Sequence, residues 1–583
     1  MTLSALIARH VQQHWRPYAA SALMLVAIAV LTVWIPRQVG QVVDGLAAGR
    51  LGAAALLRQL ALLASAGLAI YLLRVGWRLA LFGSAYRLGL ALRQRLYDQM
   101  TRQGPAFFHR QRTGDLMALA TNDIDTIEQA AGEALLAAFD GSLTLALVLA
   151  MMTLGVDWRL GLAALLPFPF MALAFWRISQ RVHSAWADSL ARFSALNQQV
   201  QDQLAGMRTL RAMGLAPQSR RQFAELAGAA GESAYQTQRW EAMYEPAVGL
   251  SLGAATVIAL GMGAWLVQRD EISIGMLTSF TMYLGQLIWP MFAAGWVLSL
   301  LERGRAAWAR LQPVLDAPDG LVDQGREAVP PGPSLHWQGL DFRYPGTEVA
   351  ALAGIELHLA PGRTLGIVGP TGAGKSTLLR LLLRQYEPDR GQVLLGGIPA
   401  PRLALDALRR TLAWVPQEPF LFSASVAENI ALASPDASRA QIAAAAELAA
   451  VHEDILRLPQ GYDTLVGERG VTLSGGQRQR VAIARALLAE APVLLLDDAL
   501  SAVDSGTETQ ILAHWRELRE RHPERSLVVV SHRLSAVREA DEIIVLRGGR
   551  IVERGTHEAL LAQDGWYASQ WRYQQLEASL DAE

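Results

Sequence analysis

A glycine-rich loop with a single lysine is the segment of this chain best suited to chemistry. Residues 369–377 read Gly369-Pro370-Thr371-Gly372-Ala373-Gly374-Lys375-Ser376-Thr377. In such a G-x-x-x-x-G-K-[ST] pattern the backbone N–H groups surround phosphate oxygens, and the lysine ammonium reaches the terminal phosphates. Lys375 is the only lysine among 52 Lys and Arg residues. Because a wide planar guanidinium does not fit inside a ring of phosphate oxygens, this lone lysine predicts a phosphate-binding loop.

Three apolar runs must position that loop and its neighbours. They are Leu365–Val368, Val493–Leu496 and Leu527–Val530. All-apolar runs of this length are typical of parallel strands buried on both faces, which bind ligands at their carboxyl ends. The first run leads into the phosphate loop, and a helix is expected directly after it. The sequence therefore predicts an α/β nucleotide-binding domain in the C-terminal half.

A second motif narrows the class of this domain. Leu473-Ser474-Gly475-Gly476-Gln477 resembles the signature of ATP-binding cassette (ABC) ATPases. Further residues match the other motifs of that family in order along the chain: Tyr344, Gln417, Asp497, Ser501-Ala502-Val503-Asp504 and His532. The phosphate loop alone is typical of many nucleotide hydrolases, whereas the ordered set is identified as that of an ABC ATPase.

The resemblance implies a role for each matching residue. Tyr344 would stack on the adenine of ATP, and Lys375 would bind its phosphates. Ser376 and Asp497 would hold Mg²⁺, and Gln417 would contact Mg²⁺ and the attacking water. His532 would contact the γ-phosphate.

The same resemblance implies a dimer. In this family two nucleotide domains face each other head to tail, and each ATP lies between the phosphate loop of one and the Ser-Gly-Gly-Gln of the other. Ser474 would close on the γ-phosphate of ATP bound to the partner, and the Ser501–Asp504 loop would cross the dimer interface. One chain therefore contributes only half of each ATP site.

Asp498 departs from the family pattern. The family places a glutamate after the strand-ending aspartate, as the catalytic carboxylate that polarises the attacking water. Aspartate is shorter by one methylene, about 1.5 Å, and a misplacement of about 1 Å can slow a reaction on the order of 10²-fold. One interpretation is a homodimer that hydrolyses ATP slowly. The interpretation that we favour is an asymmetric heterodimer in which the partner supplies the glutamate.

Composition sets outer limits on the class of protein. The chain has 583 residues, of which 52% are hydrophobic and 18% charged, so it is too long for one domain and apolar for a soluble protein. It has no cysteine, which excludes disulfides and thiolate metal sites. The net charge of −1 gives no indication of a nucleic-acid partner, and none is expected. Leu3–His10 has the pattern of a short amphipathic helix at a membrane surface.

Long apolar stretches fill the N-terminal half. They cover residues 18–37, 53–78, 132–154, 159–178, 246–267 and 273–298. Each is long enough to cross a hydrocarbon core of about 30 Å at about 1.5 Å per residue. The two long connections, 83–131 and 179–245, are rich in arginine, whereas the short links carry only Arg50 and Arg269. This asymmetry predicts a cytoplasmic side for the long connections, both termini and the nucleotide-binding domain.

These observations predict the domain organisation. We expect an all-α domain with six membrane-spanning helices over residues 1–315, and a Pro- and Gly-rich linker over 316–334. The α/β nucleotide-binding domain follows over 335–577, with a tail over 578–583. The chain thus resembles a half-transporter of the ABC exporter fold, located in the bacterial inner membrane.

Within that class the chain resembles the MdlA-type subunits of bacterial heterodimeric MdlAB (multidrug-resistance-like) transporters. The resemblance rests on Leu73–Arg78, Arg112–Met117, Met282–Pro290, Pro459–Asp463 and Asp497–Leu500. It implies an MdlB-type partner with the catalytic glutamate and export of small amphipathic compounds. It also implies cytoplasmic tips, near Thr113–Leu116 and Met213–Leu215, that dock on the nucleotide domains at segments such as Gly467–Gly470.

Intramembrane polar and aromatic residues are the candidates for substrate contact. Ionisable residues inside a span are functional candidates, and this selects Asp140; Gln286, Trp289 and Met291 lie in the last span. Structural pairing of the charge is the competing interpretation. Other functions stay open: a lipid or peptide flippase, or a half that binds ATP chiefly for regulation.

Overall fold

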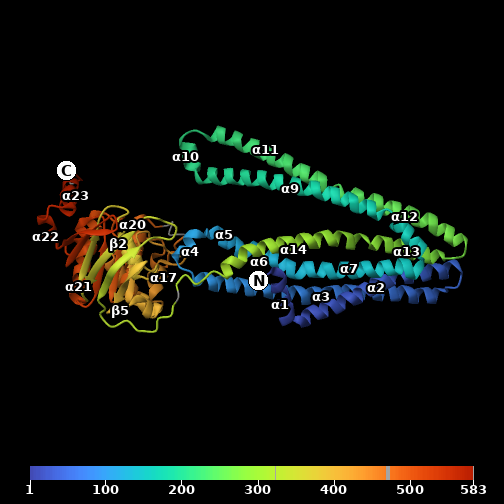
Figure 1. The fold of residues 1–583 in the computed structure, drawn as a ribbon, viewed down its shortest axis with the longest axis horizontal. Helices are drawn as coiled ribbons and strands as arrows, with labels where there is room; N and C mark the ends of the chain where they lie inside the picture. The colour runs from blue at the N-terminus through green and yellow to red at the C-terminus, as the bar shows by residue number, and fades with distance from the viewer. Residues whose placement is uncertain (322, 468–472, 582–583) are drawn as a thin grey trace. The chain divides into compact units, whose positions relative to one another are not determined.

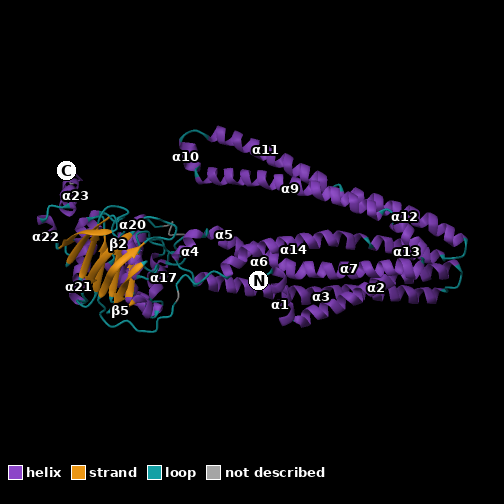
Figure 2. Cartoon of the chain, in the orientation of Figure 1, coloured by secondary structure: helices purple, strands orange, loops and turns teal. Residues whose placement is uncertain are grey.

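The computed structural model describes residues 1–321, 323–467 and 473–581. Contacts divide the chain into two units. The first comprises Met1–Gln99 and Gly114–Ala317, and the second comprises Met100–Thr113 and the residues from Pro318 onward. The first unit is all helical, and the second combines strands and helices (Figure 2). The predicted fold class is confirmed.

The helices of the first unit are long. Its elements are α1 (Leu3–Gln13), α2 (Trp15–Ala47), α3 (Ala53–Thr101), α5 (Thr113–Ala118), α6 (Ile124–Gln129), α7 (Leu135–Ala150), α8 (Trp158–Leu165), α9 (Phe168–Ala205), α10 (Met207–Ala212), α11 (Ala216–Glu241), α12 (Tyr244–Gln268), α13 (Ile274–Gln286) and α14 (Ile288–Leu315). Short π-helical turns join α5 to α6 and α6 to α7, and a third extends α7 as far as Val156. Many of these elements continue one another with only a turn between them.

Among the described residues, six helical runs are long and apolar enough to cross a membrane. They are Trp15–Ala47, Ala53–Thr101, Thr113–Val156, Trp158–Ala205, Ala216–Gln268 and Ile274–Leu315. Each predicted apolar stretch lies inside one run, except that the last stretch starts at 273, one residue before its run. The last run is interrupted at Leu287, between α13 and α14. Pro290 explains the interruption, because it has no N–H to donate to the carbonyl of Gln286.

Helices α2 and α13 pack backbone to backbone. A Cβ added to Gly275 would lie 2.0 Å from the carbonyl oxygen of Gly40, so only glycine allows this approach. Asp44 of α2 accepts hydrogen bonds from the Ser273 hydroxyl (2.6 Å) and the Gly275 N–H (2.7 Å). In the other direction, the Ser279 hydroxyl donates to the carbonyl of Pro36 at 2.8 Å. These contacts join the first span to the last.

Helices α9 and α11 form a paired extension of the spans, connected by α10 (Figure 1). They pack on each other, and of the 38 residues of α9 only Met171 and Ile178 are buried. Large apolar side chains on this pair are exposed: Trp186, Leu190, Phe193, Leu204 and Phe223. Met213 and Leu215, at the predicted tip, are exposed as well. The pair therefore presents an apolar surface that nothing within the described first unit covers.

The second unit contains two sheets. Its strands are β1 (Leu335–Phe342), β2 (Leu352–Leu359), β3 (Thr364–Val368), β4 (Arg390–Leu395), β5 (Ile398–Pro399), β6 (Leu412–Val415), β7 (Val493–Asp497), β8 (Ser526–Val530), β9 (Glu542–Arg547) and β10 (Arg550–Gly555). One sheet has the order β2-β1-β4-β5 and is antiparallel. The other has the order β10-β9-β3-β8-β7-β6, and all its pairs except β10–β9 are parallel.

The three predicted strands are confirmed as β3, β7 and β8. Every residue of β3 is buried, and it pairs with β8 on one side and β9 on the other. Because β3, β6, β7 and β8 are parallel, the segments that follow them meet at one edge of the sheet. That edge carries the phosphate loop after β3, Gln417 after β6, Asp497 and Asp498 at the end of β7, and His532 after β8.

Helices flank these sheets. They are α15 (Lys375–Leu382), α16 (Leu405–Thr411), α17 (Val426–Ile430), α18 (Arg439–Leu448), α19 (His452–Leu456), α20 (Gly475–Leu488), α21 (Ser505–Arg521), α22 (His557–Ala562) and α23 (Trp566–Asp581). Helix α15 starts at the lysine of the phosphate loop. Helix α20 starts directly after Ser474, and α21 directly after Asp504.

A segment expected in the membrane domain groups with the second unit instead. Met100–Thr113 includes the short helix α4 (Pro105–Arg110). Ala106 packs against the apolar core of the second unit, and the Gln103 amide donates to the carbonyl of Pro318 at 3.2 Å. Pro105 starts this separate helix, which the sequence analysis did not expect. Docking of the predicted tip Thr113–Leu116 stays a prediction. The predicted contact segment Gly467–Gly470 lies, apart from Gly467, outside the described residues.

Candidate nucleotide-binding site

The phosphate loop is held in a conformation that requires its glycines. Gly374 has φ +100° and caps the N-terminus of α15. A Cβ there would lie 2.6 Å from the carbonyl oxygen of Ala351, and one at Gly369 would lie 2.1 Å from that of Leu546. Both are positions where an L side chain is strained and has no room. The loop therefore opens onto the positive end of a helix, where backbone N–H groups bind anions.

A cavity of about 400 Å³ gathers most of the predicted residues at the carboxyl edge of the parallel sheet. Its lining includes the following predicted residues: Tyr344, Thr371, Gly372, Ala373, Gly374, Lys375, Ser376, Thr377, Gln417, Asp497, Asp498 and His532. Gly369 and Pro370 belong to the same loop but do not line the cavity. We call this space the nucleotide cavity.

Lys375 is buried at the base of the loop. Its Nζ donates to the carbonyls of Gly369 (2.9 Å) and Pro370 (3.0 Å). Burial lowers the pKa of the Lys375 ammonium, and the nearby carboxylates of Asp498 and Asp497 oppose that shift. The ammonium is thus poised as a compact positive charge beside two carboxylates.

Ser376 and Asp497 are adjacent in the cavity. The Ser376 hydroxyl donates to Oδ1 of Asp497 at 2.7 Å. Burial raises the pKa of Asp497, while this hydrogen bond and the charge of Arg380 act against the shift. A hydroxyl and a carboxylate oxygen side by side are hard ligands of the kind that Mg²⁺ accepts together with phosphate oxygens and water. No cluster of three or more His, Cys, Asp or Glu side chains suited to a metal occurs in the described part of the chain.

Asp498 has an unusual backbone conformation. Its φ is +52°, in the left-handed region that non-glycine residues rarely adopt, although aspartate tolerates it better than most. Its N–H donates to the carbonyl of Val530 (2.8 Å), and its carbonyl accepts from the Ser501 hydroxyl (2.9 Å). Its carboxylate accepts from the N–H of His532 at 3.3 Å. The side chain is therefore tied to the backbone at the end of the neighbouring strand β8.

Tyr344 and an unpredicted residue, Arg380, lie at one side of the cavity. The Tyr344 hydroxyl shares a hydrogen bond of 3.0 Å with the hydroxyl of Thr377 and accepts one from Arg380 at 3.1 Å. The Tyr344 ring packs edge-on against Tyr386. Arg380 and Thr347 line the cavity, yet no motif marks them. Only the spacing of Arg380, five residues after Lys375 in α15, could have indicated it.

The signature Leu473–Gln477 does not line the nucleotide cavity. Ser474 and Gly475 are exposed at the N-terminus of α20. Ser474 and Gln477 form a capping box: the Ser474 hydroxyl accepts from the Gln477 N–H (3.2 Å), and the Gln477 side chain accepts from the Ser474 N–H (2.9 Å). Two remaining predicted residues, Ser501 and Asp504, are exposed too, and Asp504 caps α21. These residues are available to a second chain.

The four predicted substrate residues divide into separate environments in the first unit. Asp140 of α7 accepts a hydrogen bond from the indole of Trp289 at 3.1 Å. The Gln286 amide donates to the carbonyl of Thr32 at 2.9 Å, which joins α13 to α2. Met291 lines a very small apolar cavity together with residues of α9, α12 and α13. Of these four residues, Asp140 and Trp289 are the two that hydrogen-bond to each other.

A membrane unit followed by a phosphate-loop ATPase unit with these motifs defines an ABC exporter half-transporter. Family profiles agree: one described as "ABC transporter transmembrane region" matches residues 18–291, and one described as "ABC transporter" matches residues 352–501. The chain belongs to the ABC transporter family.

Named relatives cover the whole chain. It is 45% identical over 583 residues to the "Multidrug resistance-like ATP-binding protein MdlA" of Escherichia coli (strain K12), covering 100% of this chain and 98% of the relative. It is 36% identical to the "Probable multidrug resistance ABC transporter ATP-binding/permease protein YheI" of Bacillus subtilis (strain 168), over 97% and 96% of the two chains. The chain is therefore an ATP-driven, multi-pass ABC exporter subunit of the multidrug-resistance-like kind.

A solved structure supports the same fold. The structure of a bacterial Atm1-family ABC exporter with ATP bound superimposes with a TM-score of 0.79. The two chains share 28% sequence identity, and the match covers 96% of this chain and 98% of the other.

Proposed function

We propose that this chain is one half of an asymmetric heterodimer that exports small amphipathic molecules across the bacterial inner membrane. Its own phosphate loop binds an ATP that turns over slowly, and its signature completes a faster site on the partner. The observation that carries this proposal is Asp498, which stands where the family has the catalytic glutamate. The proposed partner is an MdlB-type half-transporter that retains the glutamate.

The environment of Asp498 supports slow hydrolysis at this site. Its carboxylate is one methylene shorter than that of a glutamate and is held by the N–H of His532. Polarising an attacking water requires a carboxylate within hydrogen-bond reach of that water. A short side chain that is tied back to the backbone satisfies this requirement poorly.

Two features of the chain support a second half. The nucleotide cavity is built without Ser474 or the Ser501–Asp504 loop, which supports an opposite wall supplied by another chain. The apolar surface of α9 and α11 is uncovered within the described first unit. Large exposed apolar patches of this kind mark interaction surfaces.

The predicted residues fit bound Mg²⁺ and ATP. Ser376 and Asp497 would hold the metal with Gln417 beside them, and the ion would neutralise phosphate charge. The N–H groups of the phosphate loop and the Lys375 ammonium would bind the phosphates. Tyr344 would stack on the adenine after giving up its contacts with Thr377 and Arg380. His532 would contact the γ-phosphate from the end of β8.

The pair of Asp140 and Trp289 is the proposed substrate contact. Trp296 lies next to Trp289, with ring centroids 6.4 Å apart in an edge-on arrangement. A carboxylate beside two exposed indoles would attract a flat amphipathic cation through charge and cation–π contacts. Gln286 and Met291 would shape the helices around this site rather than bind the substrate.

The test is ATPase activity of the chain alone and with its partner, in nanodiscs. The partner to be tested is a second half-transporter that has a glutamate after its strand-ending aspartate. We expect weak activity alone and robust activity from the pair, which is abolished by changing the partner's glutamate to glutamine and little changed by Asp498→Asn. Robust activity of the chain alone, abolished by Asp498→Asn, would contradict the proposal.

Two further measurements distinguish the proposed function from a regulatory half and from a lipid flippase. Lys375→Ala should impair transport by the pair if ATP at this site takes part in the cycle, whereas a regulatory half would leave partner hydrolysis and transport substantially intact. Stimulation of ATPase activity by a hydrophobic cation, but not by added lipid, is expected for a drug exporter. The reverse pattern would favour a lipid flippase.

A further inference from the structure

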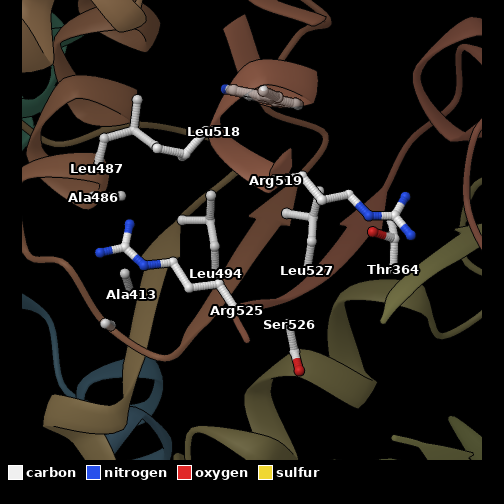
Figure 3. Close-up of a pocket in the computed structure, with 12 residues that line it drawn as sticks. Thr364, Ala413, Ala486, Leu487, Leu494, Leu518, Arg519, Arg525, Ser526 and Leu527 are labelled. Atoms are coloured by element: carbon white, nitrogen blue, oxygen red, sulfur yellow. The ribbon is translucent and has the colours of Figure 1, made fainter. Parts of the chain in front are cut away.

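Two cavities of the second unit differ in what they can hold. One lies near the amino ends of the parallel strands and has a volume of about 50 Å³, and the guanidinium groups of its Arg519 and Arg525 extend to opposite sides (Figure 3). Small-molecule sites have volumes of about 300–1,000 Å³, so this space is too small for a ligand. The nucleotide cavity, at about 400 Å³, is large enough, and its lining includes a charged residue to which no motif assigns a role, Arg380.

Arg380 has one side-chain hydrogen bond and no ion pair with the described residues. Its Nη1 donates to the Tyr344 hydroxyl at 3.1 Å, and its guanidinium carbon lies 6.0 Å from the centroid of the Tyr344 ring. A guanidinium carries five N–H donors in a fixed fork. Most of the donors of Arg380, and its charge, are therefore available to a ligand in the cavity.

The contacts of Arg380 place its guanidinium at the adenine end of the cavity. Thr377, three residues earlier on α15, lies on the same face of the helix and shares a hydrogen bond of 3.0 Å with the same Tyr344 hydroxyl. Tyr344 is the residue proposed above to stack on adenine. Lys375, at the N-terminus of α15, is the residue proposed to bind the terminal phosphates. Arg380 and Lys375 thus belong to different parts of a bound ATP.

The direction of the helix brings Arg380 toward the phosphates. In an α-helix the Cα–Cβ bonds tilt toward the N-terminus, and the N-terminus of α15 carries the phosphate loop. The charge of Arg380 also acts on the carboxylate of Asp497, where it opposes the rise in pKa that burial causes. The guanidinium is therefore close to both Tyr344 and Asp497, which line the same cavity.

The part of ATP that suits this position is the α-phosphate. In ATP the ribose and then the α-phosphate follow the adenine. A ribose is neutral and gives a guanidinium no counter-charge, whereas a phosphate is anionic and accepts two parallel hydrogen bonds from the guanidinium fork. The β- and γ-phosphates are the groups that the lysine of a phosphate loop reaches. The α-phosphate therefore combines the required charge with the required distance from the adenine.

We propose that Arg380 is a further ATP-binding residue whose guanidinium binds the α-phosphate. When Tyr344 turns to the adenine it releases Arg380, and the α-phosphate takes the place of the tyrosine hydroxyl. This inference rests on the adenine role proposed above for Tyr344, but it does not depend on the heterodimer. It adds to the phosphate loop a contact that lies outside the motif.

The test measures equilibrium binding of radiolabelled ATP to the full chain in nanodiscs, in EDTA so that metal ions do not contribute. Arg380→Gln removes the charge and should raise the Kd of ATP by about 10-fold or more, the range for a hydrogen bond to a charged group. Arg380→Lys keeps the charge and should recover part of that loss. Arg390→Gln, at an exposed position outside the cavity, is the control and should leave the Kd unchanged.

Phosphorothioate analogues show which phosphate Arg380 binds. In each of the two diastereomers of ATPαS, sulfur replaces one oxygen of the α-phosphate, and sulfur is the weaker hydrogen-bond acceptor. One diastereomer should bind the parent protein more weakly than ATP does, and this difference should disappear in Arg380→Gln. ATPγS is the control, because its α-phosphate is intact: Arg380→Gln should weaken ATPγS by the same factor as ATP.

An indirect role of Arg380, through Tyr344 alone, predicts a different result. Tyr344→Phe removes the hydroxyl that Arg380 contacts but keeps the aromatic ring. If Arg380 binds the phosphate itself, Tyr344→Phe should weaken ATP less than Arg380→Gln does. The melting temperature of the nucleotide-free protein should be the same for Arg380→Gln and Arg390→Gln, which excludes misfolding as the cause of weaker binding.

Three results would overturn the role of Arg380: an ATP affinity that Arg380→Gln leaves unchanged, equal effects of Arg380→Gln and Tyr344→Phe, or ATPαS diastereomers that show no difference from ATP that depends on Arg380. Lys375→Ala tests the proposed ATP site separately. Full ATP affinity in Lys375→Ala would contradict the site itself. Lost binding in Lys375→Ala together with unchanged binding in Arg380→Gln would overturn only the role of Arg380.

Discussion

Lengthening one side chain should accelerate ATP hydrolysis at the site of this chain. Asp498→Glu adds a methylene and moves the carboxylate outward by about 1.5 Å. If a shortfall of about 1 Å costs on the order of 10²-fold, correcting it lowers the barrier by about 2.7 kcal/mol, since each tenfold is about 1.36 kcal/mol. We therefore expect turnover at this site to rise by about 10- to 100-fold.

The same change has a cost in stability. Asp498 has φ +52°, and its carboxylate accepts from the N–H of His532. Glutamate forms such local hydrogen bonds less readily, and an ordinary side chain in the left-handed region costs about 1–2 kcal/mol. A lower melting temperature, by about 2–4 °C for each kcal/mol, should accompany the faster turnover.

The assay isolates this site within the heterodimer. The partner's catalytic glutamate is changed to glutamine, and release of phosphate is followed in a single turnover. Asp498→Asn is the control, because it keeps the size of the side chain and removes the charge. The reasoning is refuted if Asp498→Glu gives no acceleration, or if Asp498→Asn in this background hydrolyses ATP as fast as the parent.

Three further predictions follow from packing and charge. Lys375→Arg should weaken binding of a fluorescent ATP analogue by about 10-fold or more, because the buried position suits a point charge. Arg390→Lys, at an exposed position, is the control and should leave binding intact. Equal affinities of Lys375→Arg and the parent protein for the analogue would contradict this. Burial raises the pKa of Asp497, so its charged form destabilises the nucleotide-free protein above that pKa. Asp497→Asn should raise the melting temperature at pH 7, and the gain should shrink as the pH falls through the raised pKa, where Asp497 becomes protonated. A gain that stays constant with pH would exclude this cause. Gly275→Ala, with 2.0 Å between the added Cβ and the Gly40 carbonyl, should reduce the yield of monodisperse protein in detergent, whereas Gly285→Ala, with nothing within 4 Å, should not.

Local patterns account for what could be predicted of the fold. Apolar stretches of about 20 residues predict spans without knowledge of their neighbours, and the six runs of the structure contain them apart from residue 273. The runs Leu365–Val368, Val493–Leu496 and Leu527–Val530 predict strands because both faces are apolar. The short helix α4 was missed, since its Ala106 packs against core residues that lie far away in sequence.

The candidate site was predictable to the extent that its residues stand in motifs. Lys375, Asp497 and the other cavity residues were named from spacing and resemblance, and the parallel sheet brings them to one edge. Arg380 carries no such mark, because the phosphate-loop motif ends at Thr377 and fixes no residue at position 380 of α15. The contacts of Gln286 and Met291 could not be predicted either, because helix packing decides which face of a helix meets which neighbour.

The amino-acid sequence by itself determined the class of this protein. Glycines at fixed spacing around one lysine, a Ser-Gly-Gly-Gln segment and repeated apolar stretches are local properties that no packing can change. The tertiary structure alone decided how Asp498 is held, which residues surround it, and that Arg380 lies beside Tyr344 in the nucleotide cavity. The physical reason is that these features are contacts between distant parts of the chain. Hydrogen bonding and burial of such groups arise only when the sheet and its helices bring them together.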